Sequence, residues 1–302
     1  MTPRAWLLLV LLSVLWGGSF FTARIAVMEI PPLTLVLARV LLAALALDVL
    51  LIARGEVPFW RSPRWRDYLV LGLLNCALPF ALLFYATRSL GAGLTSILNA
   101  TTPIFTVLLA HVLTRDDRLT PPRLAGVLIG FAGVIVMLGP QLLGGLGSHA
   151  LADFAGLGAA VCYGLGAIRG RRFRGAPPME TAAGQLTAAT LMVLPFALVI
   201  DRPWTLAMPS PGVIAAVLVL ALLSTAAAYI LYFRILSLAG PSNANLVTLL
   251  VPVSAILLGT LILGERLEPR HWAGMALILS GLMVLDPGLR ARAAALFARL
   301  RR

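Results

Sequence analysis

The sequence predicts an all-α integral membrane protein with ten transmembrane helices, arranged as two inverted five-helix repeats. Three observations support this prediction. The 302 residues are 60% hydrophobic and only 12% charged, with a mean hydropathy of +0.96, whereas a soluble chain of this length needs more surface charge. Apolar stretches of spanning length alternate with short breaks. Finally, one part of the chain recurs half a chain later.

Ten apolar stretches are each long enough to cross a bilayer as a helix. They cover about residues 5–28, 33–53, 67–88, 92–113, 120–139, 151–169, 179–199, 211–236, 241–263 and 269–286. Breaks such as Pro31-Pro32 and Pro177-Pro178 separate them, because proline and glycine end helices and form turns. The connections are short, so we expect no domain outside the membrane.

The repeat is visible in two places. Residues 84–90 resemble residues 232–238, with Ser89 and Ser237 lying 148 positions apart. An acid-Arg-Leu-x-Pro sequence at residues 117–121 recurs at the same offset in residues 265–269. This agreement indicates a tandem duplication. We therefore divide the chain into a first repeat, a second repeat and a basic cytoplasmic tail, covering residues 1–146, 147–287 and 288–302.

The distribution of arginine predicts the orientation. With the N-terminus in the cytoplasm, eighteen of the 24 basic residues fall on the cytoplasmic side and five on the other side. Cytoplasmic loops of membrane proteins are enriched in basic residues, so both termini should be cytoplasmic. Five spans in each repeat then force the second repeat to enter the membrane from the opposite side. Inverted repeats are typical of secondary transporters, which bind substrate between the repeats near the midplane.

Polar and aromatic residues near mid-depth are the candidates for binding substrate, because polar groups inside a span usually face protein or a cavity. Nine of them are Trp16, Ser19, Asn75, Asn99, Thr102, Tyr163, Tyr229, Asn245 and Thr248. Arg39 is the tenth, and Gln185 occupies the equivalent position in the second repeat. Two interpretations of Arg39 remain open: it binds a substrate carboxylate, or it neutralises helix ends and fixes helix packing.

Pro103 and Pro252 lie at matched mid-depth positions and should kink their helices. Proline lacks the backbone donor, so it frees a carbonyl one turn earlier, on Asn99 and on Thr248. We expect both of these residues to line the cavity and the two prolines to shape moving helices. Kinks that serve packing alone are the competing interpretation.

Some chemistry is missing from the spans. No Asp or Glu lies near mid-depth, so the sequence offers no central proton-coupling carboxylate, and facilitated export is the expectation. Cys76 and Cys162 lie inside apolar spans without a histidine nearby, which is typical of core packing. We expect no metal and no cofactor. The arginines are scattered instead of sharing one face, which argues against nucleic acid as a partner.

Several motifs carry a resemblance to a known family. Residues 264–269, Gly-Glu-Arg-Leu-Glu-Pro, are followed by Ala273-Gly274, and residues 16–20 read Trp-Gly-Gly-Ser-Phe. With Pro31-Pro32 and Arg39, these motifs resemble the EamA family of the drug/metabolite transporter superfamily. The resemblance implies a ten-helix bundle that exports small metabolites, often amino acids, from the bacterial cytoplasm. This sequence departs from the family pattern in the first repeat, where Arg-Asp-Asp-Arg replaces Gly-Glu-Arg.

These observations lead to one functional prediction and three alternatives. We predict an inner-membrane exporter of amino acids or similar metabolites that works by alternating access and is not an enzyme. Its partners would be a small-molecule substrate and the lipid bilayer, with a monomer as the default state. The alternatives are a multidrug or other metabolite carrier, a passive channel, and an intramembrane enzyme.

For Glu265, a charge at a helix end is favoured over contact with substrate.

Overall fold

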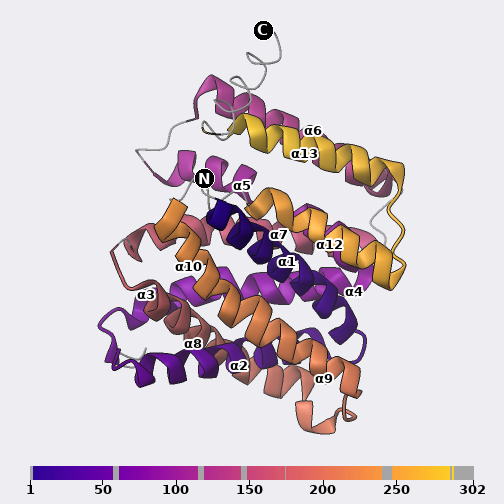
Figure 1. The fold of residues 1–302 in the computed structure, drawn as a ribbon. Helices are drawn as coiled ribbons and strands as arrows, with labels where there is room; N and C mark the ends of the chain where they lie inside the picture. The colour runs from indigo at the N-terminus through magenta and orange to yellow at the C-terminus, as the bar shows by residue number, and fades with distance from the viewer. Residues whose placement is uncertain are drawn as a thin grey trace.

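The computed structural model describes residues 3–56, 61–114, 119–143, 148–173, 175–239, 247–285 and 288. Over these ranges every regular element is helical (Figure 1). Six helical segments in the described chain are long and apolar enough to cross a membrane, and three shorter apolar helices accompany them.

The first half of the chain begins with two long helices and then becomes irregular. Its helices are α1 (Pro3–Ala26), α2 (Pro32–Ala53), α3 (Trp65–Gly72), α4 (Leu78–Asn99), α5 (Thr102–Leu113) and α6 (Pro121–Leu143). A π-helical segment, Leu73–Ala77, joins α3 to α4. Proline occupies the first turn of α2 and of α5, where its missing N–H has no helical partner to lose.

The second half follows a similar order. Its helices are α7 (Ser148–Gly170), α8 (Pro178–Phe196), α9 (Pro211–Leu218), α10 (Ala228–Ala239), α12 (Val247–Leu263) and α13 (Pro269–Leu285). A second π-helical segment, Val219–Ala227, joins α9 to α10 without a break. A third, Ala197–Asp201, extends α8.

The helix predicted over residues 92–113 is not continuous. Gly91 has a positive φ of 83°, which separates the start of this stretch from the preceding helix although both belong to α4. The chain then forms a turn at Ala100-Thr101 before α5 begins. The physical reason is Pro103, which cannot donate a backbone hydrogen bond to Asn99. The break falls just before Pro103, where the sequence predicts a kink, and it separates α4 from α5 completely.

Close helix contacts depend on glycine. In α6 and α13, a Cβ on Gly126 would lie 2.8 Å from the Gly281 carbonyl oxygen, and one on Gly133 would lie 2.7 Å from that of Gly274. The two helices therefore run antiparallel with their backbones in contact, as Figure 1 shows. They pack together at one edge of the helical bundle.

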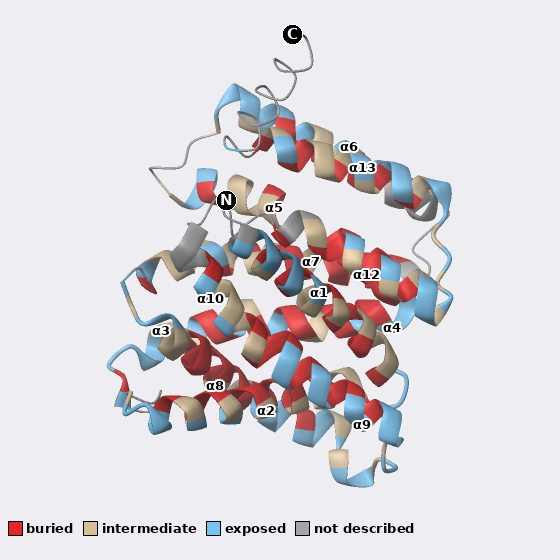
Figure 2. Cartoon of the chain, viewed as in Figure 1, coloured by how far each residue is buried: buried red, intermediate tan, exposed pale blue. Residues whose placement is uncertain are grey.

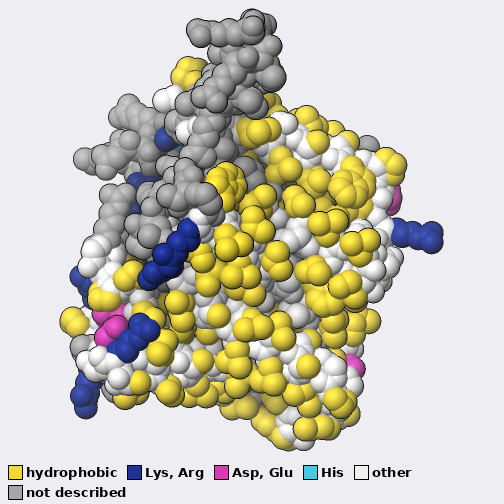
Figure 3. All heavy atoms as spheres, viewed as in Figure 1, with side chains coloured by type: hydrophobic (Ala, Val, Ile, Leu, Met, Phe, Trp, Pro, Cys, Tyr) yellow, Lys and Arg dark blue, Asp and Glu magenta, His cyan; other side chains and the backbone are white. Residues whose placement is uncertain are grey.

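Much of the described outer surface is apolar. Buried residues face the inside of the bundle (Figure 2). Large hydrophobic side chains cover the face drawn in Figure 3, with charges gathered near its margins. Leu7 and Leu261, for example, are 69% and 79% exposed. Such a surface suits lipid instead of water. The chain is a multi-pass membrane protein.

Candidate functional site

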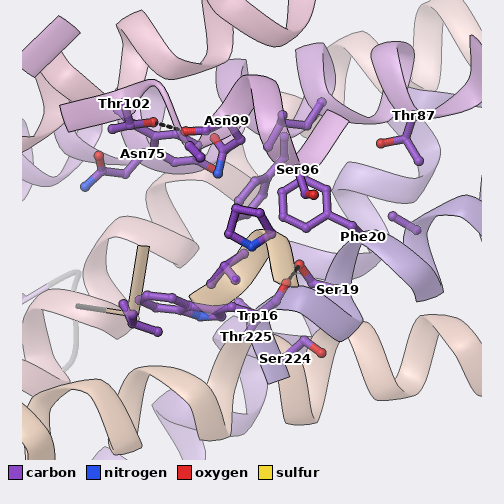
Figure 4. Close-up of a pocket in the computed structure, with 18 of the residues that line it drawn as sticks. Trp16, Ser19, Phe20, Asn75, Thr87, Ser96, Asn99, Thr102, Ser224 and Thr225 are labelled. Carbon is purple, nitrogen blue, oxygen red and sulfur yellow. Dashed lines mark hydrogen bonds between the residues drawn. The ribbon is translucent and has the colours of Figure 1, made fainter. Parts of the chain in front are cut away.

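A cavity of about 380 Å³ lies inside the bundle, a size that suits a small metabolite. Its walls come from α1, α2, α4, α5, α7, α10, α12 and the two π-helical segments beside α4 and α10. In the close-up, Asn75, Asn99 and Thr102 lie on one side, with Trp16 and the two π-helical residues Ser224 and Thr225 on the other (Figure 4).

The structure brings most of the predicted residues to this one cavity. Those that line it are Trp16, Ser19, Arg39, Asn75, Asn99, Thr102, Tyr163, Tyr229 and Pro252. Pro103 lies in the first turn of α5, next to Thr102, and is not among the lining residues. Asn245 lies outside the described residues, and so does the side chain of Thr248. The role of these residues in binding substrate stays a prediction.

Several lining residues were not singled out from the sequence. They are mainly aromatic or small: Phe20, Phe80, Phe84, Thr87, Ser96 and Tyr232. Apolar rings carry no signal of their own in a chain that is apolar almost throughout. The spacing of four between Phe80 and Phe84 is the one available clue, because it places both rings on the same face of a helix.

Arg39 is the charged group of the cavity wall. Its side chain comes from α2 and is only 7% exposed. Its Nε donates a hydrogen bond of 2.9 Å to the Thr225 hydroxyl, and its guanidinium carbon lies 3.7 Å from the Phe80 ring centroid. The Phe84 ring centroid is 5.7 Å away. The ring faces attract the cation and position it.

A π-helical segment provides the acceptor for Arg39. Thr225 lies in Val219–Ala227, and its hydroxyl donates to the Leu220 carbonyl at 2.8 Å. With its proton used there, the oxygen can accept from Arg39. π-Helical segments inside α-helices are frequent at functional sites, because the extra residue redirects side chains that an α-helix would turn elsewhere.

No acid balances this arginine within the described chain. The carboxylates that form ion pairs there are Asp67, with Arg169 and Arg172, and Glu268, with Arg270. No described residue bonds the two terminal nitrogens of Arg39 either. A cation without an ionic partner inside a membrane protein is costly, so Arg39 stays a candidate for binding substrate.

A second buried contact has the same form but is neutral. Gln185, on α8, is 3% exposed. The Asn75 amide nitrogen donates to its Oε1 at 3.2 Å. Asn75 belongs to the π-helical segment Leu73–Ala77. An amide pair satisfies itself and needs no counter-ion.

The carbonyl of Asn99 is not left free, contrary to expectation. Pro103 does deprive it of its helical partner, but the Thr102 hydroxyl donates to it at 2.7 Å (Figure 4). What remains available is the Asn99 side-chain oxygen, a buried atom without a partner among the described residues. The acceptor without a partner at this position is thus a side-chain amide oxygen and not a backbone carbonyl.

Glu265 has the predicted helix-end role. Its carboxylate accepts hydrogen bonds from the backbone N–H groups of Ala92 and Gly93 at 2.6 and 2.9 Å. Both follow Gly91, where the chain begins a new helical stretch, and a carboxylate is stabilised at such an N-terminus. Asp117, its counterpart in the first repeat, lies outside the described residues.

Comparisons with known proteins agree with this architecture. The model of the EamA-like transporter family matches residues 4–139 and again residues 150–285. A "Probable amino-acid metabolite efflux pump" of Escherichia coli (strain K12) is 28% identical, over 97% of this chain and 98% of that protein. The "Uncharacterized inner membrane transporter YedA" of the same strain is 27% identical, over 92% and 89%. The "Uncharacterized transporter YoaV" of Bacillus subtilis (strain 168) is 23% identical, over 90% and 93%.

A solved structure has the same fold. Its title reads "Crystal structure of protein", and it superposes with a TM-score of 0.67 at 22% identity. The alignment covers 96% of this chain and 99% of the other.

Proposed function

This chain belongs to the EamA-like transporter family, and from that premise we propose that it exports small metabolites, above all amino acids, across the bacterial inner membrane. The observation that carries the proposal is the cavity of about 380 Å³ inside the bundle, with polar side chains and one arginine in its wall. The relative named an amino-acid metabolite efflux pump supports the substrate class, and YedA, named an inner membrane transporter, supports the location.

Alternating access between two inverted halves is the mechanism we propose. Its support is a set of exchanged contacts. Gly126 meets Gly281, and Gly133 meets Gly274. Positions 126 and 274 are 148 apart, as are 133 and 281, so each contact repeats the other with the halves swapped. A two-fold axis in the membrane plane predicts this exchange.

A second exchanged pair lies closer to the cavity. A Cβ on Gly17 would lie 2.8 Å from the backbone nitrogen of Ala255, and one on Gly164 would lie 3.2 Å from that of Thr106. Gly17 and Gly164 belong to equivalent helices, α1 and α7. Gly17 packs on α12 and Gly164 on α5, so each contacts the opposite half of the chain. The eighteen arginines counted on one side of the predicted spans support cytoplasmic positions for both termini, because cytoplasmic loops are enriched in basic residues.

The alternatives differ in what they predict for flux. A passive channel would not saturate and would show no counterflow. A carrier for cationic drugs would be expected to place an acid in its cavity, and none of the described lining residues is Asp or Glu. An intramembrane enzyme would consume its substrate instead of releasing it unchanged.

Proteoliposomes containing the full chain test the proposal. They are loaded with labelled amino acids, sugars or nucleosides, and efflux is followed with and without a pH gradient. We expect saturable efflux of amino acids, stimulated by unlabelled amino acid outside and independent of the pH gradient. Efflux that never saturates would contradict the carrier mechanism. Efflux that requires the proton gradient would contradict facilitated export.

A further inference from the structure

We propose that the cavity selects its substrates by charge: it takes a monocarboxylate with a bulky apolar or aromatic body, anchored on Arg39, and rejects cations that lack a carboxylate. This inference rests on the proposed function, because it names the substrate class of the same cavity.

The first step concerns the buried charge. Arg39 lines the cavity and is held by its Nε on Thr225 and by the Phe80 ring, and its terminal nitrogens have no hydrogen-bond partner among the described residues. A guanidinium presents paired N–H groups that match the two oxygens of a carboxylate. Since no described carboxylate pairs with Arg39, the substrate itself is the group that would supply the missing negative charge.

The second step concerns the substrate body. Phe80 and Phe84 flank Arg39, and Trp16 packs near Tyr232 with ring centroids 5.6 Å apart. All four residues line the cavity. Aromatic walls around a single charged anchor favour a ligand with one ionic end and an apolar remainder.

The third step concerns other charges on the ligand. Arg39 is the one cationic side chain among the described lining residues, so a phosphate dianion would be only half balanced. An ammonium group finds no acid there, but the buried side-chain oxygen of Asn99 can accept a hydrogen bond from it. A zwitterionic amino acid is therefore accepted through its carboxylate. A simple amine finds the same acceptor but brings no carboxylate for Arg39, whose charge repels it.

The test keeps the apolar body constant and varies the charge. Labelled L-phenylalanine undergoes counterflow in proteoliposomes, and unlabelled phenylpyruvate or 2-phenylethylamine competes with it. For the wild type we expect phenylpyruvate to compete at least about as well as phenylalanine, and the amine at least about ten-fold less well. Equal competition by the amine would overturn the inference. Flux of other amino acids without phenylalanine would overturn it too, whereas absence of flux for every amino acid would overturn the proposed function.

Variants locate the effect on Arg39. Arg39→Gln removes the charge, and we expect the apparent affinity for phenylalanine and phenylpyruvate to fall about 10- to 100-fold, with competition by the amine unchanged or improved. Arg66→Gln is the matched control, because Arg66 is exposed and outside the cavity lining. Wild-type affinity in a folded Arg39→Gln protein would refute the assignment.

A third variant covers the case in which Arg39→Gln does not fold. Arg39→Lys keeps the charge but loses the paired N–H groups. We expect it to retain the preference for phenylpyruvate over the amine, with weaker binding of both carboxylates than in the wild type. Ligand-induced shifts in thermal unfolding give the same comparison without transport. Loss of the charge preference in Arg39→Lys would contradict the inference.

Discussion

Arg39 and Gln185 form two contacts with the same form and opposite chemistry. Each lies on the second helix of a segment that matches the family model, and each bonds to a π-helical residue of the other segment. Both side chains are buried, at 7% and 3% exposure. Arg39 brings a charge that Thr225 only partly satisfies, whereas Gln185 and Asn75 form a neutral pair.

The comparison separates what the fold repeats from what it does not. The contacts between α6 and α13 are alike in both directions, with glycine against glycine. The matching positions 39 and 185, by contrast, differ in charge. The two segments that match the family model thus offer comparable positions near the site, while the charge comes from one of them.

Moving the charge from one side to the other is the strongest way to break this comparison. The double variant Arg39→Gln/Gln185→Arg should recover part of the roughly 10- to 100-fold loss of phenylalanine affinity expected for Arg39→Gln alone, because an arginine at 185 would also be near the cavity. The concentration giving half-maximal counterflow measures it. Size-exclusion chromatography checks that the double variant folds, and no recovery in a folded protein would mean that the two positions are not equivalent.

Removing the partner on each side sharpens the contrast. Thr225→Val deletes a hydrogen bond to a charged group, typically about 1.5–3 kcal/mol, whereas Gln185→Met deletes a neutral bond of about 0.5–1.5 kcal/mol. We therefore expect Thr225→Val to reduce phenylalanine binding and stability more than Gln185→Met. Ligand-induced shifts in thermal unfolding measure both effects. Equal effects would show that the Arg39 contact is not the special one.

The glycine contacts provide the symmetric counterpart. A Cβ on Gly133 would lie 2.7 Å from the Gly274 oxygen, and one on Gly281 would lie 2.6 Å from the Gly126 oxygen. Gly133→Ala and Gly281→Ala should each cost about 1–3 kcal/mol through overpacking, and by similar amounts. Thermal unfolding of the two single variants tests this. A large difference between them would argue against equivalence of the halves.

The smallest effect is expected at a loop, away from both contacts. The Ser210 backbone N–H and hydroxyl donate to the Glu29 carboxylate at 2.7 and 2.8 Å, which lowers the pKa of Glu29 below its ordinary value. A lowered pKa means that this contribution to stability is present above the ordinary pKa and is lost as the pH falls through the lowered one.

The wild type should therefore exceed Glu29→Gln slightly in unfolding temperature near neutral pH. The advantage should shrink as the pH falls through the lowered pKa of Glu29 and the carboxylate becomes protonated. An advantage that persists in acid would show that Glu29 acts through packing. Glu29 is exposed and does not line the cavity. The difference in unfolding temperature between each cavity variant and the wild type should therefore be the same at neutral and at acidic pH.

Much of the helical arrangement could be predicted from apolar length and from proline and glycine. α2 begins at Pro32 and ends at Ala53, as expected for the stretch 33–53. Depth counting also placed Asn75 and Tyr163 near the cavity that they line. The bounds of α2 could be predicted because bilayer thickness and helix breakers act locally, whereas binding of substrate by Asn75 and Tyr163 stays a prediction.

What could not be predicted depends on contacts between distant residues. The pairing of Arg39 with Thr225 joins positions 186 apart, and no local pattern marks it. The π-helical segments are invisible for the same reason. The role of Thr102 as donor to the Asn99 carbonyl required the turn at Ala100-Thr101, which apolar length alone does not reveal.

Because Glu265 caps the helical stretch that begins at Ala92, the residue types at positions 91 and 265 constrain each other. A Cβ on Gly91 would lie 2.6 Å from Glu265 Oε1, so the carboxylate occupies the space that any larger residue at 91 would need. The positive φ of Gly91 disfavours other residues for a second reason. Neither residue can change alone without harm, so drift in this family should replace Gly91 and Glu265 together, as a linked pair.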